Sequence, residues 1–156
     1  MEKVILLIED SADDELLFRH VVRQCGLANP ILVAHDGDEA TAYLKGERQF
    51  ADREKFPLPD VLFLDLKLPK ISGFDLLLWM KTQPHLSRLL VVVLSHLGET
   101  DEIRQAYFLG AHSFLTKPVT QADIQNLANH FSGRWILALP GQILQTRPHL
   151  ENPQAG

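Results

Sequence analysis

Three short segments of this chain consist almost entirely of apolar residues, and none of them alternates polar with apolar side chains. The segments are residues 4–8, 61–64 and 89–94. Such runs are typical of β-strands buried on both faces, as in parallel sheets covered by helices on both sides. The first run ends at Glu9 and Asp10, and the second ends at Asp65, which precedes Pro69 and Gly73 in a predicted loop. We therefore expect an α/β fold in which acidic side chains follow two buried strands.

Segments with helical spacing of apolar residues separate the predicted strands, which also include residues 30–35 and 112–116. The expected helices are residues 12–25, residues 39–45, a segment that ends near Gln83, a segment closed by Gly110, and a last helix with an apolar face from Ile124 to Trp135. The first helix is predicted to turn Leu17 inward, and the third Leu78. Residues 46–59 are expected to form a long surface loop. Alternation of five strands with five helices implies a parallel sheet with helices on both faces.

The composition limits the classes of function open to the chain. Its 156 residues have the length of one domain, and its net charge of -5 gives no general attraction to nucleic acid or anionic lipid. The single cysteine, Cys25, excludes an intramolecular disulfide framework and fits a reducing cytosol. No apolar stretch is long enough for a signal-peptide core or a membrane span. The expected location is the cytoplasm, with no nucleic-acid or membrane partner.

The carboxyl ends of all strands in a parallel sheet lie at one edge, so polar residues that follow the strands are expected to converge there. These residues are Glu9, Asp10, Asp65, Ser95 and Lys117. Clustered carboxylates repel one another unless a cation relieves the repulsion, and Mg2+ suits them because it binds carboxylates, keeps several waters and shares phosphoryl oxygens. Asp65 is then a candidate nucleophile toward phosphorus. Lys117 would stabilise charge on the phosphoryl oxygens, and Ser95 would donate a hydrogen bond to one of them.

The sequence resembles the receiver domain of two-component response regulators. The motifs that carry the resemblance are residues 8–11, residues 65–69 with Gly73, residues 94–95 and residues 116–118. The resemblance extends over residues 4–131 and implies a flavodoxin-like receiver fold, a doubly wound five-stranded sheet of strand order 2-1-3-4-5. It also implies that a histidine kinase phosphorylates Asp65. The implied Mg2+ ligands are Glu9, Asp10, Asp65 and the backbone carbonyl of Lys67.

By the same resemblance, phosphorylation draws Ser95 inward and lets Phe114 on the fifth strand change its packing, which makes a two-state switch. The chain departs from the family at His96, where a small residue is usual, and the bulky imidazole is expected to slow the approach of phosphodonors or water. Lys67 and Leu97 occupy positions at which the family varies the lifetime of the phosphoryl group. Our hypothesis is that these two side chains shield the aspartyl phosphate from water.

Looser features resemble the single-domain regulators paired with bacterial phytochrome-type histidine kinases. They are the long loop 46–59, residues 115–119 and the apolar segment 135–140. The expected organisation is a receiver domain at residues 1–135 and a C-terminal tail at residues 136–156, with no output domain. The signal would then leave through the face of the fourth helix, fifth strand and fifth helix, which the family uses for dimers and targets. A homodimer and an unknown downstream protein are the expected partners, and Tyr107, Phe108 and Trp135 are candidates for that surface.

Other functions fit the sequence less well. Phosphatases of the haloacid dehalogenase type, which act through an aspartyl phosphate, carry a second acid two residues after the first, where this chain has Lys67 after Asp65, so the chain is not expected to be an enzyme. A flavodoxin-like cofactor binder would need a phosphate-binding loop after the first strand, where Glu9 and Asp10 would repel phosphate. A vestigial site with phosphorylation-independent docking or dimerisation stays open, and only a phosphorylation assay separates it from the first hypothesis.

Two further acids, Asp13 and Asp14, follow the first strand and are predicted to lie in the first turn of a helix capped by Ser11. Ser11 and Asp14 have the spacing of a capping box. The seven histidines show neither i, i+4 pairing nor accompanying cysteine ligands, which argues against a zinc site.

Overall fold

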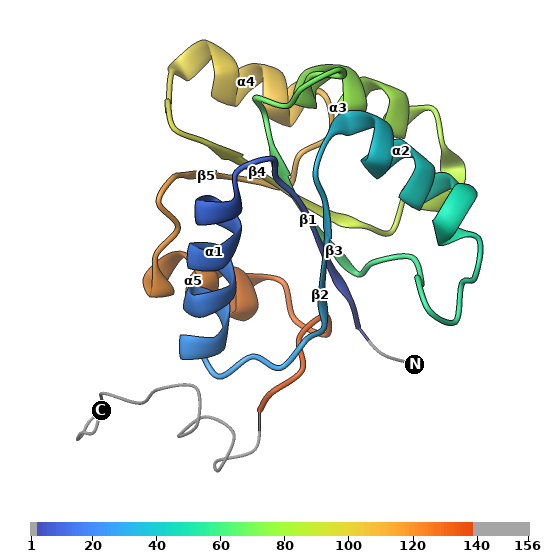
Figure 1. Ribbon diagram of the computed structural model, residues 1–156. Coiled ribbons are helices and arrows are strands. Elements are labelled where there is room, and N and C mark those ends of the chain that lie inside the picture. Colours follow the sequence, from blue (N-terminus) through green and yellow to red (C-terminus); the bar gives the residue numbers. More distant parts are fainter. Residues whose placement is uncertain (1–2, 139–156) are drawn as a thin grey trace, which may run out of the picture.

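The chain forms a five-stranded parallel sheet with helices on both faces, as the computed structural model shows for residues 3–138, the residues it describes (Figure 1). The strands are β1 (Ile5–Ile8), β2 (Ile31–Ala34), β3 (Val61–Asp65), β4 (Leu90–Ser95) and β5 (Ser113–Thr116). The helices are α1 (Ala12–Gln24), α2 (Gly37–Lys45), α3 (Gly73–Lys81), α4 (Thr100–Phe108) and α5 (Gln121–His130), with short 3-10 helices η1 (Arg48–Phe50) and η2 (Pro84–Leu86). The strand order β2-β1-β3-β4-β5 confirms the predicted doubly wound fold. None of the helices in this part of the chain is long and apolar enough to cross a membrane.

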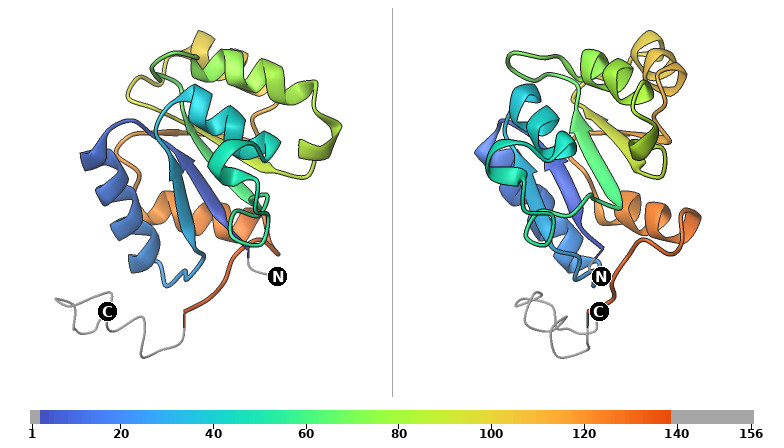
Figure 2. Two further views of the ribbon diagram at one scale, coloured as in Figure 1. Left: turned by 45° about the vertical axis from the view of Figure 1, so that its right-hand side comes forward. Right: turned by 90° about the vertical axis from the view of Figure 1, so that its right-hand side faces the viewer.

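Each central strand buries side chains on both faces of the sheet, which explains its uniformly apolar sequence. Leu6 and Ile8 belong to a core that includes residues of α2, α3 and α4. Ile5 and Leu7 belong to a second core that includes residues of α1 and α5. This division follows from the two-residue period of a strand. Figure 2 shows the two groups of helices on opposite sides of the sheet.

The sheet register places polar residues at its carboxyl edge. Asp65 is the last residue of β3, and Ser95, the last residue of β4, pairs with Thr116 of β5. Lys117 follows, and its amide donates to the carbonyl of Ser95 at 2.8 Å. The peptide bond between Lys117 and Pro118 is cis. Chain segments that are far apart in the sequence therefore present their side chains at the same edge.

The last helix is shorter than the sequence predicts. It ends at His130, so the prediction that Trp135 belongs to this helix is wrong. The chain leaves helical geometry at Phe131, which has a φ of -118° and a ψ of 84°. Gly133 then has a φ of 85°, a conformation that glycine adopts without steric cost. Trp135 instead packs half-buried against the second core, and its indole N–H donates to the carbonyl of Phe131 at 2.7 Å.

In two helices one residue predicted to face inward is exposed, although Val21 of α1 and Leu77 of α3 are buried as expected. Leu17 of α1 and Leu78 of α3 are exposed, and the buried positions include Phe18, Val22 and Leu76. Both helices contain consecutive apolar residues, so their spacing alone does not fix which residue faces inward. A shift of one residue rotates the inward face by about 100°.

The predicted surface loop between α2 and β3 is anchored to α2. Phe50 of η1 is buried, and its ring centroid lies 5.0 Å from that of Tyr43. The guanidinium of Arg53 donates to the carbonyls of Tyr43, Leu44 and Phe56 at 2.8, 2.9 and 3.0 Å. The loop therefore contributes an aromatic side chain to the core.

The chain beyond α5 packs against the segment between α1 and β2. Leu137 forms an antiparallel bridge with Leu27. Residues 136–138, the first residues of the predicted tail, thus contact the domain. The rest of the predicted tail, residues 139–156, lies outside the described residues.

Candidate functional site

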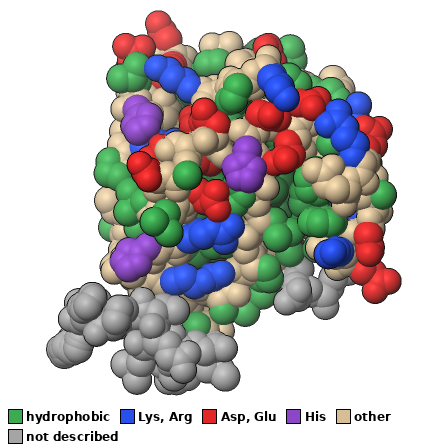
Figure 3. Space-filling view, in the orientation of Figure 1, with side chains coloured by type: hydrophobic (Ala, Val, Ile, Leu, Met, Phe, Trp, Pro, Cys, Tyr) green, Lys and Arg blue, Asp and Glu red, His purple; other side chains and the backbone are tan. Residues whose placement is uncertain are grey.

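Three carboxylates meet at the carboxyl edge of the sheet. Glu9 and Asp10 follow β1 and Asp65 ends β3, and one oxygen of each lies within 4.8 Å of those of the other two. Glu9 and Asp65 are buried, whereas Asp10 is exposed. Acidic side chains are frequent over the middle and upper part of the face that Figure 3 shows. The topology therefore brings three oxygen donors around one point.

Lys117 lies among three carboxylates, of which Glu9 and Asp65 are buried and Asp14 is half-buried, and it uses its three N–H donors on them. Its Nζ donates to Oε1 of Glu9, and it donates to Oδ2 of Asp14 and Oδ2 of Asp65 at 3.0 Å each. The lysine side chain is only 6% exposed, so water competes little for these charge-assisted bonds. The contact with Asp14 joins residues 103 positions apart, and no local spacing in the sequence indicates it.

Burial and neighbouring charges shift the pKa values of Glu9 and Lys117. Burial raises the pKa of Glu9 to about 7; the hydrogen bond from Lys117 opposes this rise, and the neighbouring Asp65 adds to it. Burial alone would lower the pKa of Lys117, but its hydrogen bonds to the three carboxylates raise that pKa above the ordinary lysine value. Lys117 is therefore charged at neutral pH, and one lysine does not balance all the acids around it.

Ser11 sets the geometry of the turn between β1 and α1. Its Oγ accepts from the amide of Asp14 at 3.2 Å, and its own amide donates to Oε2 of Glu9 at 3.2 Å. The capping box predicted for Ser11 and Asp14 is only half formed, because the Asp14 carboxylate binds Lys117 instead of the Ser11 amide. This turn supplies two of the three carboxylates that hold Lys117.

The loop after β3 holds Asp65 through the backbone. The amide of Lys67 donates to Oδ1 of Asp65 at 3.0 Å, while Oδ2 accepts from Lys117. The amide of Gly73 donates to the carbonyl of Leu66 at 3.0 Å. A Cβ atom on Gly73 would lie 2.7 Å from Cα of Leu66, so a larger residue would displace this loop. The backbone carbonyl of Lys67 belongs to the same turn, and the side chain of Lys67 is exposed.

Ser95 is buried at the end of β4, and its hydroxyl bonds to helix α4. Its Oγ donates to Oε1 of Glu102 at 3.3 Å and accepts from the amide of Leu97 at 3.1 Å. Within residues 3–138, no hydrogen bond joins this hydroxyl to the side chain of Asp65 or Lys117. The sequence did not indicate the contact with Glu102, which depends on how α4 packs over the strand end.

Two further predicted residues lie outside the carboxylate cluster. Phe114 is half-buried and packs against the core on the side of α2, α3 and α4. His96 is largely exposed, and its Nε2 lies 3.5 Å from Oδ2 of Asp14. His96, Asp14 and Lys117 help to line a cavity of about 70 Å³ beside Glu9.

The donor set of the cluster fits a hard divalent cation. All three donors are carboxylate oxygens, the ligands that Mg2+ and Mn2+ prefer. The raised pKa of Glu9 reflects an environment that disfavours its negative charge, which a cation would relieve. Across residues 3–138, this is the one group of three or more His, Cys, Asp or Glu side chains arranged to hold an ion.

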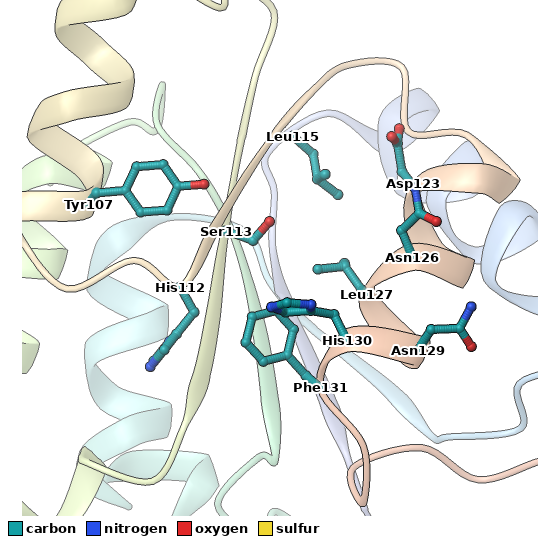
Figure 4. A pocket seen from close by; sticks show the side chains of 10 residues that line it. All are labelled: Tyr107, His112, Ser113, Leu115, Asp123, Asn126, Leu127, Asn129, His130 and Phe131. Carbon is teal, nitrogen blue, oxygen red and sulfur yellow. The ribbon is translucent and has the colours of Figure 1, made fainter.

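A larger cavity of about 580 Å³ lies between α4, β5 and α5 (Figure 4). Its lining combines aromatic, imidazole and amide groups, including Tyr107, His112, Asn126, His130 and Phe131. In Figure 4, Tyr107 extends from α4 toward β5, and His130 and Phe131 come from the end of α5. None of the clustered carboxylates lines this cavity, so it is a separate feature of the surface.

Comparisons with known proteins agree with this arrangement. A family model described as response regulator receiver domain matches residues 5–129. Rcp1 of Synechocystis sp. is 32% identical over 134 residues, which are 86% of this chain and 89% of Rcp1. The structure of Mn2+-bound Rcp1 has a TM-score of 0.71 at 31% identity, covering 88% of this chain and 99% of that chain.

Two other solved structures come from regulators associated with phytochromes. The bacteriophytochrome response regulator RtBRR has a TM-score of 0.78 at 31% identity, covering 96% of this chain and 91% of that chain. The phosphorylated cyanobacterial phytochrome response regulator RcpA has a TM-score of 0.70 at 28% identity, covering 86% of this chain and 99% of that chain. The expected resemblance to phytochrome-type regulators is thus confirmed. The chain belongs to the response regulator receiver domain family.

Proposed function

We propose that this receiver domain accepts a phosphoryl group on Asp65 from a histidine kinase, with Mg2+ bound beside it, and signals by phosphorylation-dependent docking or dimerisation. The proposal rests on the burial of Asp65 and on the charged groups around it. Its side chain is 7% exposed, its Oδ2 lies 3.0 Å from Nζ of Lys117, and it shares the cluster with Glu9 and Asp10. A fixed carboxylate with a lysine at hydrogen-bond distance is suited to attack phosphorus and to stabilise the charge that develops.

In the proposed reaction, an oxygen of Asp65 attacks the phosphorus of a phosphohistidine on the kinase. The new P–O bond forms as the N–P bond breaks, and the leaving imidazole nitrogen takes up a proton. Lys117 stabilises the phosphoryl oxygens through N–H groups that it turns away from its carboxylate partners.

The proposed Mg2+ ligands are Glu9, Asp10, Asp65 and the backbone carbonyl of Lys67. When bound, the ion supplies positive charge that favours the approach of the phosphoryl group to this acidic site. Support comes from the carboxylate donor set and from Rcp1, whose Mn2+-bound form is structurally similar.

Ser95 and Phe114 are the proposed switch residues. The hydroxyl of Ser95 would leave Glu102 and donate to a phosphoryl oxygen. Because Ser95 pairs with Thr116, a displacement of Ser95 would act directly on β5, the strand that carries Phe114. A local change of charge would thereby bias two packing arrangements of the same element.

The proposed output surface is the face formed by α4, β5 and α5, which contains the cavity of about 580 Å³. Tyr107 and Phe108 on α4 are 47% and 78% exposed, as suits a docking surface. Trp135 is a poor candidate for this surface, because it packs half-buried against the second core. The proposed occupants are a downstream protein or a second copy of the chain.

The similarity to RtBRR and RcpA supports a phytochrome-type kinase as the phosphodonor. Such a kinase would act on this protein in the cytoplasm. We further propose that this receiver domain works as a phosphoacceptor and has no catalytic cycle of its own.

The test is to incubate the protein with acetyl phosphate, with and without Mg2+, and to measure its intact mass. We expect one added phosphoryl group that requires Mg2+ and disappears in Asp65→Asn. The matched control is Asp60→Asn, which alters an aspartate just before β3 and should leave the modification unchanged.

Wild-type protein that stays unmodified by both acetyl phosphate and a panel of phosphorylated phytochrome-type kinases would contradict the proposal. That outcome would favour the vestigial site, with docking or dimerisation independent of phosphorylation.

A further inference from the structure

The three acceptors of Lys117 have different fates in the proposed reaction. Asp65 becomes the phosphorylated residue, so the oxygen that attacks phosphorus loses its negative charge. Glu9 belongs to the carboxylate cluster that fits a metal ion. Asp14 also binds Nζ, at 3.0 Å, yet it is neither the phosphoacceptor nor a member of that cluster. Of the three, only Asp14 is left with no other proposed role.

Asp14 has a fixed backbone and a second neighbour besides Lys117. Its amide donates to Oγ of Ser11 at 3.2 Å, which fixes its backbone at the start of α1. Its Oδ2, the oxygen that accepts from Lys117, also lies 3.5 Å from Nε2 of His96, the residue that follows β4. The carboxylate thus lies between α1, which carries it, and His96, which follows β4, and both are separate from the loop after β3.

We infer that Asp14 is a positioning residue for Lys117. It holds one N–H of the ammonium group while the other two turn from Glu9 and Asp65 to the phosphoryl oxygens. This inference rests on the proposed function and extends it to a residue that first appeared to be only a helix-turn acid. Keeping one hydrogen bond fixed limits the motion that Lys117 makes during transfer, and such preorganisation accelerates reactions.

Asp13 offers an internal comparison. It lies in the same first turn of α1 and is also an aspartate, but it is exposed, and its side chain forms no hydrogen bond or ion pair with the other residues that the structure describes. A general effect of acids in this turn, through the helix dipole or the net charge, would be shared by Asp13 and Asp14. A positioning effect on Lys117 belongs to Asp14 alone.

The experiment measures the rate of phosphorylation by acetyl phosphate at saturating Mg2+ in Asp14→Ala, Asp14→Asn and Asp13→Ala. We expect Asp14→Ala to slow the reaction about tenfold, which is the rate effect expected when one hydrogen bond to a charged group is lost. Asp14→Asn keeps an oxygen acceptor without the charge and should stay within roughly threefold of the wild type. Asp13→Ala should stay within roughly twofold, because it leaves Lys117 untouched.

A second measurement detects the contact without any phosphorylation. Asp14→Ala is combined with Lys117→Met, and urea unfolding is followed for the wild type, both single variants and the double variant. If Asp14 holds Lys117, the shift in the unfolding midpoint caused by Asp14→Ala will be much smaller in the Lys117→Met background. Equal shifts in both backgrounds would overturn the contact itself.

The inference fails if Asp14→Ala reacts as fast as the wild type, or if it slows no more than Asp13→Ala does. It also fails if Asp14→Asn is as slow as Asp14→Ala, since charge and not the hydrogen bond would then be responsible. Each of these outcomes presupposes a wild type that is phosphorylated on Asp65. A wild type that is never modified overturns the proposed function instead, and the unfolding cycle still decides whether Asp14 holds Lys117.

Discussion

At the scale of single residues, Lys67 and Leu97 lie at the rim of the site on different loops. The amide of Lys67 is bound to Asp65, and its side chain is exposed. The amide of Leu97 is bound to Oγ of Ser95, and its side chain is 47% exposed. The backbone of each residue is therefore tied to a site residue, while each side chain remains accessible to solvent.

We predict that Lys67→Ala and Leu97→Ala each shorten the lifetime of the aspartyl phosphate by roughly twofold to tenfold. Easier access of water to phosphorus would lower the activation free energy of hydrolysis by up to about 1.4 kcal/mol. The lifetime is measured as the loss of the added phosphoryl mass after the phosphodonor is removed. Lys55→Ala and Leu78→Ala, at exposed positions on other elements, serve as controls and should decay at the wild-type rate. Decay in the two rim variants that matches these controls would contradict shielding.

At the scale of elements, the loop after β3 is packed against the start of α2. A Cβ atom on Gly37 would lie 2.5 Å from Cβ of Ile71 and 2.7 Å from its carbonyl oxygen. Lys70 on the same loop has a φ of 68° and pairs with Asp36, the N-cap of α2, at 3.3 Å. The first residue of α2 must therefore be small for this loop, which carries the Lys67 carbonyl, to keep its position.

We predict that Gly37→Ala lowers the free energy of unfolding by about 1–3 kcal/mol and weakens Mg2+ binding, because the new methyl group displaces Ile71 and its loop. Urea unfolding and calorimetric titration with Mg2+ measure the two effects. Gly98→Ala is the matched control, since its Cβ would meet only the hydroxyl of Thr116, at 3.1 Å, on a side chain that can rotate. Unchanged Mg2+ affinity in Gly37→Ala would show that the loop tolerates the displacement.

At the scale of the whole molecule, Asn29 joins three chain segments at the amino edge of the sheet. It is fully buried, and its Nδ2 donates to the carbonyls of Lys3 and Arg134 at 2.8 and 2.9 Å. Its Oδ1 accepts from the amide of Ile136 at 2.8 Å. The start of the chain and the segment after α5 are thereby fixed to the residues that precede β2, at the edge opposite the carboxylate cluster.

We predict that Asn29→Ala destabilises the domain by about 2–4 kcal/mol, because it leaves several buried backbone groups without a partner. Asn129→Ala, an exposed asparagine on α5, should change stability by less than about 0.5 kcal/mol. Since Asn29 lies far from Asp65 along the strands, the rate of phosphorylation of the folded variant should match the wild type. Urea unfolding and the acetyl phosphate assay together test both statements, and a slower phosphorylation would indicate coupling between the two edges.

Much of the fold was predictable from local patterns in the sequence. Uniformly apolar runs predicted strands buried on both faces, and Gly, Pro and capping residues placed most helix ends within a few residues. The residue that faces inward was less predictable where apolar residues are consecutive, as at Leu17 and Phe18. The extension of the last helix to Trp135 was wrong because the backbone leaves helical geometry at Phe131, before the apolar spacing ends.

The sequence by itself determined which residues stand at the strand ends, because that depends only on the order of strands and loops along the chain. It thereby determined that Glu9, Asp10 and Asp65 belong to one acidic edge. The tertiary structure decided the partners within that edge, namely Asp14 for Lys117 and Glu102 for Ser95. The physical reason is that hydrogen bonds depend on angles and distances of a few ångströms between elements far apart in sequence, and those are set by the packing of helices on the sheet.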